Sequence, residues 1–349
     1  MNQLQTPSLA PERAVPPLYA PYDLQRPAMF DAAALHTKFP ALAAFHAKLG
    51  NTDLIEVPAL PGGARILAKC EWQNPAGSIK DRVAYALLCT ALQRHGKRPL
   101  SELKVLEYSG GNLAAALSKL GHELGIATRF VLSSFAPQSL LAMLAERGSR
   151  VELVDKSLGF YAVIEHALAL AAAEPDWTLL YQHRNAVNVQ FHHDTTGAEI
   201  LRQLGGAEPH AWVASIGTGG TLIGVSRALR AANPALRTVG ATPAELPYAS
   251  HEPPNGLPKY AGSGGMGNGI RQPFVRADDE HVEHRTVSFD DAMRGMAEFR
   301  ALTGLKIGSS ASANWQIARQ IAAELSPGHT VVTVFPDAGT PEEWQRALS

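Results

Sequence analysis

From about residue 31 onward, short apolar runs alternate with longer segments in which Ala and Leu recur at helical spacing. The apolar runs predict buried β-strands at residues 65–69, 104–108, 128–132, 150–154, 212–216, 237–241 and 330–335. The segments with helical spacing predict α-helices at residues 80–94, 113–124, 139–147, 222–232 and 313–324. Because strands and helices alternate, the pattern predicts an α/β fold whose parallel sheets are covered by helices on both faces.

The first 30 residues differ from the rest of the chain. They contain six prolines and little helical or strand periodicity, which predicts an extended arm that lies on the folded body or stays mobile. At 349 residues the chain is long enough for two domains, or for two lobes of one fold. The glycine-rich stretch 260–270 predicts a long polar loop, which in a compact domain is more often functional or mobile than incidental.

Composition narrows the class of protein. Lys and Arg total 31 against 32 Asp and Glu, and this net charge of −1 disfavours a nucleic-acid binder or a polybasic membrane protein. Two cysteines, Cys70 and Cys89, are too few for a disulfide framework or a four-thiolate zinc site. The N-terminus lacks a basic patch followed by an apolar run, and the longest apolar stretch, 162–173, is too short to span a bilayer. We therefore expect a soluble, cytoplasmic globular protein.

A glycine-rich turn between a predicted strand and a predicted helix carries the sharpest chemical signal. Five residues form it: Gly217, Thr218, Gly219, Gly220 and Thr221. At such a turn, backbone N–H groups can converge on an oxyanion, assisted by the helix dipole and by the threonine hydroxyls. The turn therefore predicts a phosphate site; the alternative is a tight turn whose threonines only cap the helix. Its spacing matches neither the P-loop nor the G-x-G-x-x-G pattern, which disfavours simple nucleotide binding.

A second turn, residues 74–82 with the sequence NPAGSIKDR, places Lys80 at the start of a helix. The positive end of the helix dipole disfavours a protonated amine there and favours the neutral amine that forms Schiff bases. The alternative is a solvated lysine paired with Asp81 or Glu71.

Two more turns precede predicted helices. Residues 108–112 contain two glycines followed by Asn112, which can cap the helix or present N–H groups to a carboxylate. The turn Gly308-Ser309-Ser310 is, by itself, an ordinary helix cap.

Together, the four turns supply what pyridoxal phosphate (PLP) requires: a phosphate cup, an amine and polar side chains on separate strand-to-helix junctions. The chain resembles the cysteine synthase and cystathionine β-synthase family of PLP enzymes, which have fold type II, like the tryptophan synthase β subunit. Residues 74–82 resemble its cofactor-lysine motif, 217–221 its phosphate loop and 109–113 its substrate-carboxylate loop. The resemblance covers about residues 48–340 in the family's order and includes five further stretches: 50–52, 195–197, 262–269, 308–310 and 335–337.

The resemblance implies a two-lobed, three-layer αβα fold with twisted, mostly parallel sheets. Residues 1–47 would form a Pro-rich arm or extension. Residues 48–185 would form the N-terminal lobe, the start of which can cross to the other lobe, and 186–349 the C-terminal lobe.

The resemblance also implies individual roles. Lys80 would hold PLP as an internal aldimine and act as general base at Cα, and Asn112 would hydrogen-bond the cofactor's 3′ oxygen. Ser309 would face the pyridine nitrogen, where a neutral hydroxyl suits β-elimination better than transamination. Five residues would hold the phosphate: Gly217, Thr218, Gly219, Gly220 and Thr221. Five others would contact the substrate: Ser109, Gly110, Gly111, Leu113 and Gln182.

The implied reaction is a β-replacement in amino-acid biosynthesis, of the transferase or lyase type. An activated serine, such as O-acetylserine or O-phosphoserine, would lose its leaving group to give an aminoacrylate, to which sulfide or another nucleophile adds. The family's carboxylate loop usually reads Thr-Ser-Gly-Asn-Thr, and here Gly110 and Leu113 each remove a hydroxyl donor. Each missing donor weakens carboxylate binding by about 1 kcal/mol. We therefore expect one or both substrates to differ from those of housekeeping cysteine synthase.

Two alternatives remain at this point. A serine or threonine dehydratase would release the aminoacrylate without adding a nucleophile, and a non-catalytic relative would keep the fold as a binding module. The histidine clusters at 192–194 and 280–284 lack metal-site spacing, so no metal is predicted. The expected partners are a small amino acid, a small nucleophile and a second copy of the chain in a homodimer, with no nucleic acid and no membrane.

Overall fold

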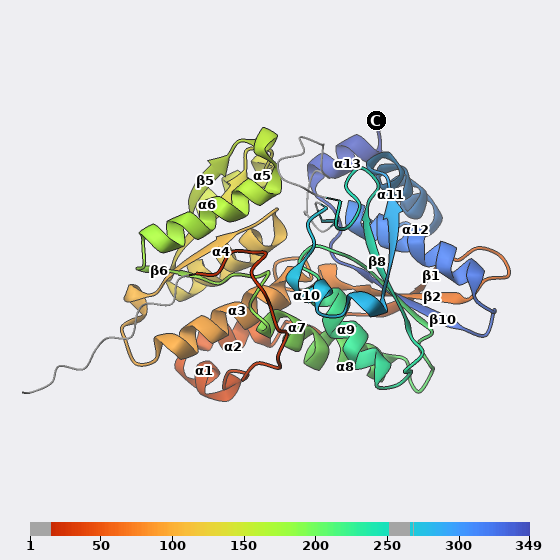
Figure 1. The fold of residues 1–349 in the computed structure, drawn as a ribbon, viewed down its shortest axis with the longest axis horizontal. Coiled ribbons are helices and arrows are strands. Elements are labelled where there is room, and N and C mark those ends of the chain that lie inside the picture. Colours follow the sequence, from red (N-terminus) through yellow and green to blue (C-terminus); the bar gives the residue numbers. More distant parts are fainter. Residues whose placement is uncertain (1–14, 251–265, 268) are drawn as a thin grey trace, which may run out of the picture.

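The computed structural model describes residues 15–250, 266–267 and 269–349. Two lobes are visible in Figure 1, each built around its own sheet. Both sheets are mostly parallel and lie between helices, which confirms the predicted two-lobed α/β fold. The start of the predicted arm, residues 1–14, lies outside the described residues, as does most of the predicted glycine loop.

The larger sheet has six strands in the order β1-β2-β10-β7-β8-β9. Its strands span Leu54–Val57 (β1), Arg65–Cys70 (β2), Ala211–Ser215 (β7), Arg237–Pro243 (β8), Val282–Val287 (β9) and Thr330–Phe335 (β10). The edge strand β1 is antiparallel to β2, and the other pairs are parallel. Strand β2, from the start of the predicted N-terminal lobe, thus pairs with β10 near the end of the chain, and β1 pairs with β2. The lobe boundaries themselves stay a prediction.

The smaller sheet is entirely parallel, in the order β5-β4-β3-β6. Its strands span Lys104–Tyr108 (β3), Ala127–Ser133 (β4), Arg150–Val154 (β5) and Trp177–Leu179 (β6). Successive side chains alternate between its faces: Leu106 and Tyr108 enter one apolar cluster, and Val105 enters the other. Both faces are therefore buried, as expected for a parallel sheet between helices.

Helices of the smaller lobe form two layers around this sheet. Helix α6 packs on one face, and α3, α4 and α5 share the apolar cluster on the other. Helices α1 and α2 pack outside, against α3 and α4. The bounds are Ala32–Lys38 (α1), Pro40–His46 (α2), Lys80–His95 (α3), Asn112–Leu124 (α4), Gln138–Glu146 (α5) and Gly159–Ala173 (α6).

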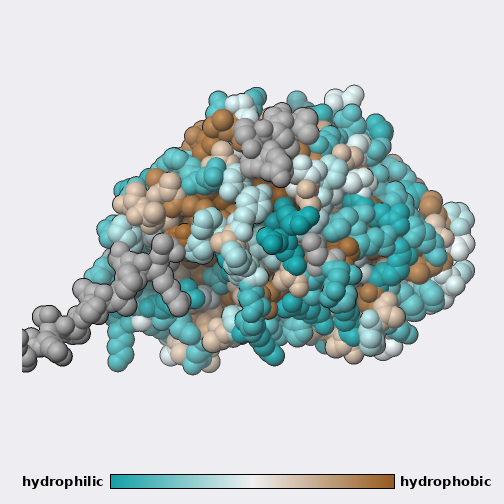
Figure 2. All heavy atoms as spheres, in the orientation of Figure 1, coloured by the Kyte–Doolittle hydropathy of each residue, from teal (hydrophilic) through white to brown (hydrophobic). Residues whose placement is uncertain are grey.

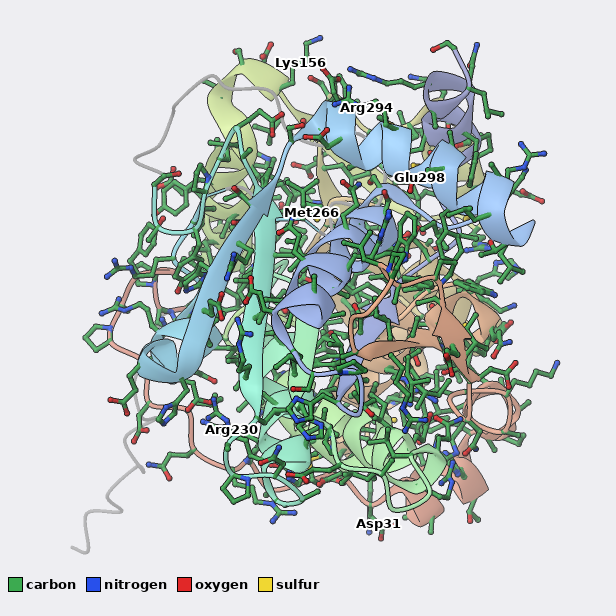
Figure 3. The ribbon with its side chains drawn as sticks, turned by 90° about the vertical axis from the view of Figure 1, so that its right-hand side faces the viewer. Asp31, Lys156, Arg230, Met266, Arg294 and Glu298 are labelled. Carbon is green, nitrogen blue, oxygen red and sulfur yellow. The ribbon has the colours of Figure 1, made fainter. Side chains whose placement is uncertain are left out.

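In the larger lobe, α12 covers one face of the sheet and α9 the other. Figure 3 shows α11, labelled at Arg294 and Glu298, beside α12. Met266, also labelled there, is buried in the apolar cluster that includes α12. The bounds are Val187–His192 (α7), Ala198–Gln203 (α8), Gly220–Arg230 (α9), Pro273–Arg276 (α10), Phe289–Thr303 (α11), Ser309–Glu324 (α12) and Pro341–Ala347 (α13). Short helical turns lie at Glu71–Gln73 (η1), Leu100–Glu102 (η2), Lys156–Leu158 (η3) and Asp279–His281 (η5), and a π-helical segment at His193–Gly197 (η4) joins α7 to α8.

The molecular surface is mixed in character. Figure 2 shows a face covered mostly by hydrophilic side chains, with hydrophobic ones gathered in patches. Within the described ranges, no helix combines the length and apolar character needed to cross a membrane. The same part of the chain brings no three His, Cys, Asp or Glu side chains together as a candidate metal site.

Candidate active site

Loops that follow the carboxyl ends of parallel strands line one cavity at the centre of the molecule. In parallel α/β sheets this edge also collects the N-termini of the following helices, where ligands bind. Ten residues line the cavity: Lys80, Ser109, Gly110, Leu113, Phe160, Gln182, His183, Gly217, Thr218 and Gly267. Seven of these carry a predicted site role. Five other residues with a predicted role lie on the same loops and helices as lining residues: Gly111, Asn112, Gly219, Gly220 and Thr221. Ser309 lies at the start of α12 and does not line the cavity.

Lys80 is the first residue of α3, as its position after the turn predicts. Its Nζ lies 3.5 Å from Oε1 of Gln182 and forms no ion pair with any described residue. The alternative partners are engaged elsewhere: the Asp81 carboxylate accepts from the Ala76 N–H, and Glu71 pairs with Arg82. Burial lowers the pKa of Lys80 to about 8, so far more of its amine is neutral near physiological pH than in an ordinary lysine with a pKa of 10.5.

Glu107, at the end of β3, is a buried carboxyl that the sequence reasoning missed. Its two oxygens accept hydrogen bonds from the backbone N–H groups of Tyr108 (3.1 Å) and Gln182 (3.2 Å). Burial raises the pKa of Glu107 to about 8, although these N–H groups and the charge of Lys80 oppose the rise. Glu107 thereby joins the carboxylate loop to the loop that carries Gln182. A lone acidic residue in the apolar run KVLEY was the available signal.

The predicted carboxylate loop is preorganised by Ser109. The buried Oγ of Ser109 accepts from the N–H groups of Gly111 (3.0 Å) and Ala114 (3.2 Å), which leaves its own hydrogen available to donate. Across the cavity, Nε2 of Gln182 donates to the Tyr108 carbonyl oxygen at 2.7 Å. The amide oxygen of Gln182 is thereby turned toward Lys80. The Ser109 hydroxyl and the remaining N–H of the Gln182 amide are the two hydrogen-bond donors beside this space that a carboxylate would need.

The predicted phosphate loop has a geometry that glycine alone satisfies. Gly219 adopts φ +85°, and a Cβ there would lie 2.5 Å from Cγ2 of Val275. A Cβ on Gly220 would lie 2.3 Å from Oδ1 of Asn188. Thr218 Oγ1 accepts from the Gly220 N–H and from Asn188 Nδ2, both at 3.1 Å, which leaves the Thr218 hydroxyl hydrogen available to donate.

A neutral histidine supports the last residue of this loop. Nε2 of His192 lies 3.2 Å from Thr221 Oγ1, and its Nδ1 lies 2.9 Å from Thr196 Oγ1. Burial lowers the pKa of His192 to about 3. The N-terminus of α9, the glycine backbone and the two threonine hydroxyls therefore fit an anionic phosphate group, and a desolvated lysine lies on the same cavity. These residues fit PLP.

The segment at residues 335–337 joins the N-termini of three helices. The carboxylate of Asp337 accepts from Nδ2 of Asn112 at 2.8 Å, and its carbonyl oxygen accepts from the Gly308 N–H at 3.1 Å. The Pro336 carbonyl oxygen accepts from the Ile79 N–H at 2.8 Å, directly before Lys80. These bonds connect the starts of α3, α4 and α12.

Ser309 is buried at the start of α12, and its hydroxyl donates to the carboxyl of Glu343 on α13. Burial and the neighbouring charge of Asp337 raise the pKa of Glu343 to about 7. The role of Ser309 opposite a pyridine nitrogen stays a prediction.

His183 and Phe160 were also missed by the sequence reasoning. His183 is buried, its Nδ1 lies 2.7 Å from the Tyr108 hydroxyl, and the two rings stack with centroids 5.3 Å apart. Burial lowers the pKa of His183 to about 3, so this wall of the cavity is a neutral imidazole. Its place beside Gln182 was a usable signal, whereas Phe160 lies in α6, far from any motif in sequence.

Comparisons with known proteins agree with this geometry. The family model described as "Pyridoxal-phosphate dependent enzyme" matches residues 47–337. A cysteine synthase of Aquifex aeolicus is 31% identical over 305 residues, which cover 83% of this chain and 88% of that protein. An O-acetylserine dependent cystathionine β-synthase of Bacillus subtilis is 29% identical, with 83% and 92% covered. The crystal structure of an enzyme with the same description from Helicobacter pylori superposes with a TM-score of 0.74 at 27% identity, covering 84% of this chain and 94% of that one.

The family match and the relatives extend over most of the chain. The cavity is lined by a lysine and by parts of the predicted phosphate and carboxylate loops, on separate strand-to-helix junctions. The chain therefore belongs to the family of PLP-dependent enzymes of fold type II, in its cysteine synthase and cystathionine β-synthase group.

Proposed function

We propose that Lys80 is the residue that binds PLP and moves the Cα proton in a β-replacement on an amino acid activated at Cβ. One observation carries this proposal. The Lys80 amine, whose pKa burial lowers to about 8, opens onto a cavity that also holds the carboxylate loop and the start of the phosphate loop. A neutral amine is the form that both attacks a carbonyl and accepts a proton.

When bound, PLP supplies an aldehyde for the lysine amine and a ring that accepts electron density from Cα. The α9 N-terminus and the hydroxyls of Thr218 and Thr221 hold the phosphate. Asn112, already fixed by Asp337, orients the ring, and Ser309 approaches it from the start of α12. These contacts come from the N-termini of four helices, α3, α4, α9 and α12, so the cofactor would be held from both lobes.

The substrate's carboxylate binds between Ser109 and Gln182. Ser109 donates its hydroxyl hydrogen, and Gln182 donates the amide N–H that is not bonded to the Tyr108 carbonyl oxygen. This placement brings Cα of the substrate close to Nζ of Lys80, which takes the α-proton. Closure of the cavity over the substrate excludes water and favours the added nucleophile over hydrolysis.

The cavity walls support altered substrate preference. Leu113 and Phe160 present apolar side chains, and His183 presents a neutral imidazole. These walls favour a nucleophile that carries an apolar group, so we expect a small organic thiol to be used at least as well as sulfide. Ordinary cysteine synthase efficiency with O-acetylserine and sulfide would contradict this expectation.

Assembly and location complete the proposal. The family resemblance supports a homodimer with one site in each subunit, which light scattering of the purified protein measures directly. A cytoplasmic location stays a prediction from the sequence, testable by fractionation of the source cells.

The first experiment combines trapping with turnover. The protein loaded with PLP is reduced with borohydride and digested, and mass spectrometry is expected to find the cofactor on the peptide that contains Lys80. O-acetylserine, O-phosphoserine and serine are then supplied with sulfide and with a panel of thiols. A thioether or cysteine product supports β-replacement, whereas pyruvate alone indicates a dehydratase. Absence of any adduct on Lys80 overturns the proposal.

A further inference from the structure

The N-terminal segment 15–22 is held by one arginine next to the active site. In Figure 1 this part of the chain, in dark red, crosses the molecule before it reaches α1. Arg184 lies in the loop between β6 and α7, and forms no ion pair with a carboxylate in the described part of the chain. Its guanidinium instead donates to four carbonyl oxygens: those of Pro17 (3.3 Å), Leu18 (2.9 Å), Ala20 (2.7 Å) and Pro21 (2.9 Å).

Ring and apolar contacts reinforce this attachment. The Arg184 guanidinium lies 4.8 Å from the centre of the Tyr22 ring, a cation–π distance. Leu18 is only 1% exposed and belongs to the same apolar cluster as Tyr108 and Ile270. An arginine with four backbone acceptors and an aromatic ring is a specific clamp, since a side chain with fewer donors could not satisfy the same set.

Tyr181 forms the second attachment, three residues before Arg184. Its hydroxyl donates to the Pro16 carbonyl oxygen at 2.9 Å. Its backbone has φ +58°, a left-handed conformation that a tyrosine adopts only when its surroundings hold it there. Segment 15–22 is part of those surroundings.

The two residues between these attachments both line the active-site cavity. Gln182 is bonded to the Tyr108 carbonyl and to Glu107, and its Oε1 faces Lys80 at 3.5 Å. His183 is held by the Tyr108 hydroxyl. Because Tyr181 and Arg184 flank this pair, a shift of segment 15–22 is transmitted to both cavity side chains through a short length of backbone.

We infer that residues 15–22 form a strap that positions Gln182 and His183 for amino-acid binding, with Arg184 as the positioning residue that fastens it. The inference rests on the proposed function, in which Gln182 contacts the substrate. The family match begins at residue 47, so the strap lies outside the matched part of the chain. The strap is thus a feature through which this chain sets its own substrate affinity.

The test compares four variants of the PLP-loaded enzyme. Arg184→Ala and a truncation that removes residues 1–22 are expected to raise the KM for the amino acid about tenfold while lowering kcat less than about threefold, because carboxylate binding rather than the reacting groups is disturbed. Arg184→Lys keeps the charge but not the fork of donors, and should fall between Arg184→Ala and the wild type. Tyr181→Phe removes one hydrogen bond and should raise KM about twofold.

Two controls separate positioning from general stability. A truncation of residues 1–14 leaves the strap in place, and Arg319→Ala removes a half-buried arginine that packs 4.6 Å from the ring centre of Trp315, far from the strap. Both should leave KM unchanged. Borohydride labelling of Lys80 should be equal in all variants. A purely structural role would lower the melting temperature and the active fraction without changing KM.

Hydrogen exchange supplies a readout that does not depend on activity. In the strap variants, the amides of residues 181–185 should exchange faster than in the wild type, with and without PLP. The inference is overturned if Arg184→Ala leaves the KM or the hydrogen exchange of these amides unchanged. If Arg184→Ala does not fold, the same criterion applies to Arg184→Lys and Tyr181→Phe. If the wild type itself takes no PLP on Lys80, the proposed function fails, and exchange alone then decides whether the strap orders the loop.

Discussion

Two lysines inside the molecule lie close to the start of α3, and their surroundings differ. Nζ of Lys69 lies 2.9 Å from Oε2 of Glu199 and also donates to the Thr52 carbonyl and to Gln203. Nζ of Lys80, in contrast, has a long 3.5 Å contact with an amide oxygen and no ion pair among the described residues. Each site contains a desolvated lysine and a buried glutamate, but the lysine forms an ion pair with a glutamate only at the Lys69 site.

The paired site is a cluster of four charges that sum to zero. Arg82 makes two hydrogen bonds to each of two carboxylates, Glu71 and Glu199, at 2.7–2.9 Å. The Arg82 charge holds the pKa of Glu71 at about 2 despite complete burial, and Arg82 and Lys69 hold the pKa of Glu199 below its usual range despite partial burial. Both carboxylates therefore stay charged at neutral pH, beside the two cations that pair with them.

In the unpaired site, burial dominates. It lowers the pKa of Lys80 and raises the pKa of Glu107, each to about 8. Groups with such values exchange protons near neutral pH, which is what acid–base chemistry requires. The comparison shows that the placement of partners decides what a buried lysine does. A lysine within ion-pair distance of a carboxylate stabilises the fold, whereas a lysine without such a partner has an amine that can react.

The largest expected effect is the loss of activity in Lys80→Met. Covalent attachment and proton transfer are both removed, so turnover should fall by more than about 10⁴-fold, the upper end of what one acid–base group contributes. Steady-state rates and borohydride labelling measure this. A variant that retains a tenth of wild-type activity would show that Lys80 is not the reactive amine.

Stability should respond in the opposite sense at the two lysines. Lys69→Met leaves Glu199 with one partner fewer in a buried site and should reduce the free energy of unfolding by about 3–5 kcal/mol. Lys80→Met, the matched control, removes a poorly paired, desolvated amine and should leave the free energy of unfolding of the cofactor-free protein unchanged or higher. Urea unfolding measures both. Equal losses in the two variants would contradict the comparison.

Glu107→Gln tests the unpaired carboxyl through pH. Because the folded-state pKa of Glu107 lies at about 8, above the ordinary value of 4.5, the folded protein binds an extra proton between these values. Its contribution to stability is therefore full below about pH 4.5 and is lost as the pH rises through 8. The amide of the variant does not titrate, so the wild type should lose about 5 kcal/mol relative to the variant across this window.

Thermal unfolding of the cofactor-free proteins at several pH values across this window measures the loss. A constant difference between wild type and variant would mean that Glu107 keeps an ordinary pKa in the folded protein.

The sequence predicted central strands better than edge strands. Strands β3 and β10, which lie inside their sheets, have the predicted bounds 104–108 and 330–335. The strands that were missed, β1, β6 and β9, all lie at sheet edges. Strand β9 is buried only at its two end residues, and its half-buried or exposed middle carries Glu283, His284 and Arg285, so no apolar run marks it. Helix α11 was missed too, although Ser288 caps it in the usual way by accepting from the Asp291 N–H.

The residues of the candidate site also differ in how well the sequence marks them. The positions of Lys80 and of the predicted phosphate loop at the starts of helices could be predicted, because a local turn in the sequence marks each of them. For Glu107 and His183 the sequence offers only their positions as a signal, because their pKa values depend on burial by segments far apart in the sequence. The strap is a similar case: prolines indicate an extended segment, but only the fold shows that Arg184 fastens it beside the cavity.

The smallest expected effect comes from a solvent-accessible pair with the same chemistry as the buried cluster. Lys119 and Glu123 lie one turn apart on α4, 2.8 Å from each other, with about a third of each side chain exposed. Water solvates both ions in the folded and the unfolded chain, so Lys119→Ala should change the free energy of unfolding by less than about 0.5 kcal/mol, and less still in high salt. The same urea assay that reports on Lys69→Met measures this change. If Lys119→Ala reduced the free energy of unfolding as much as Lys69→Met does, pairing alone would explain the stabilisation by the buried cluster, and burial would not contribute to it.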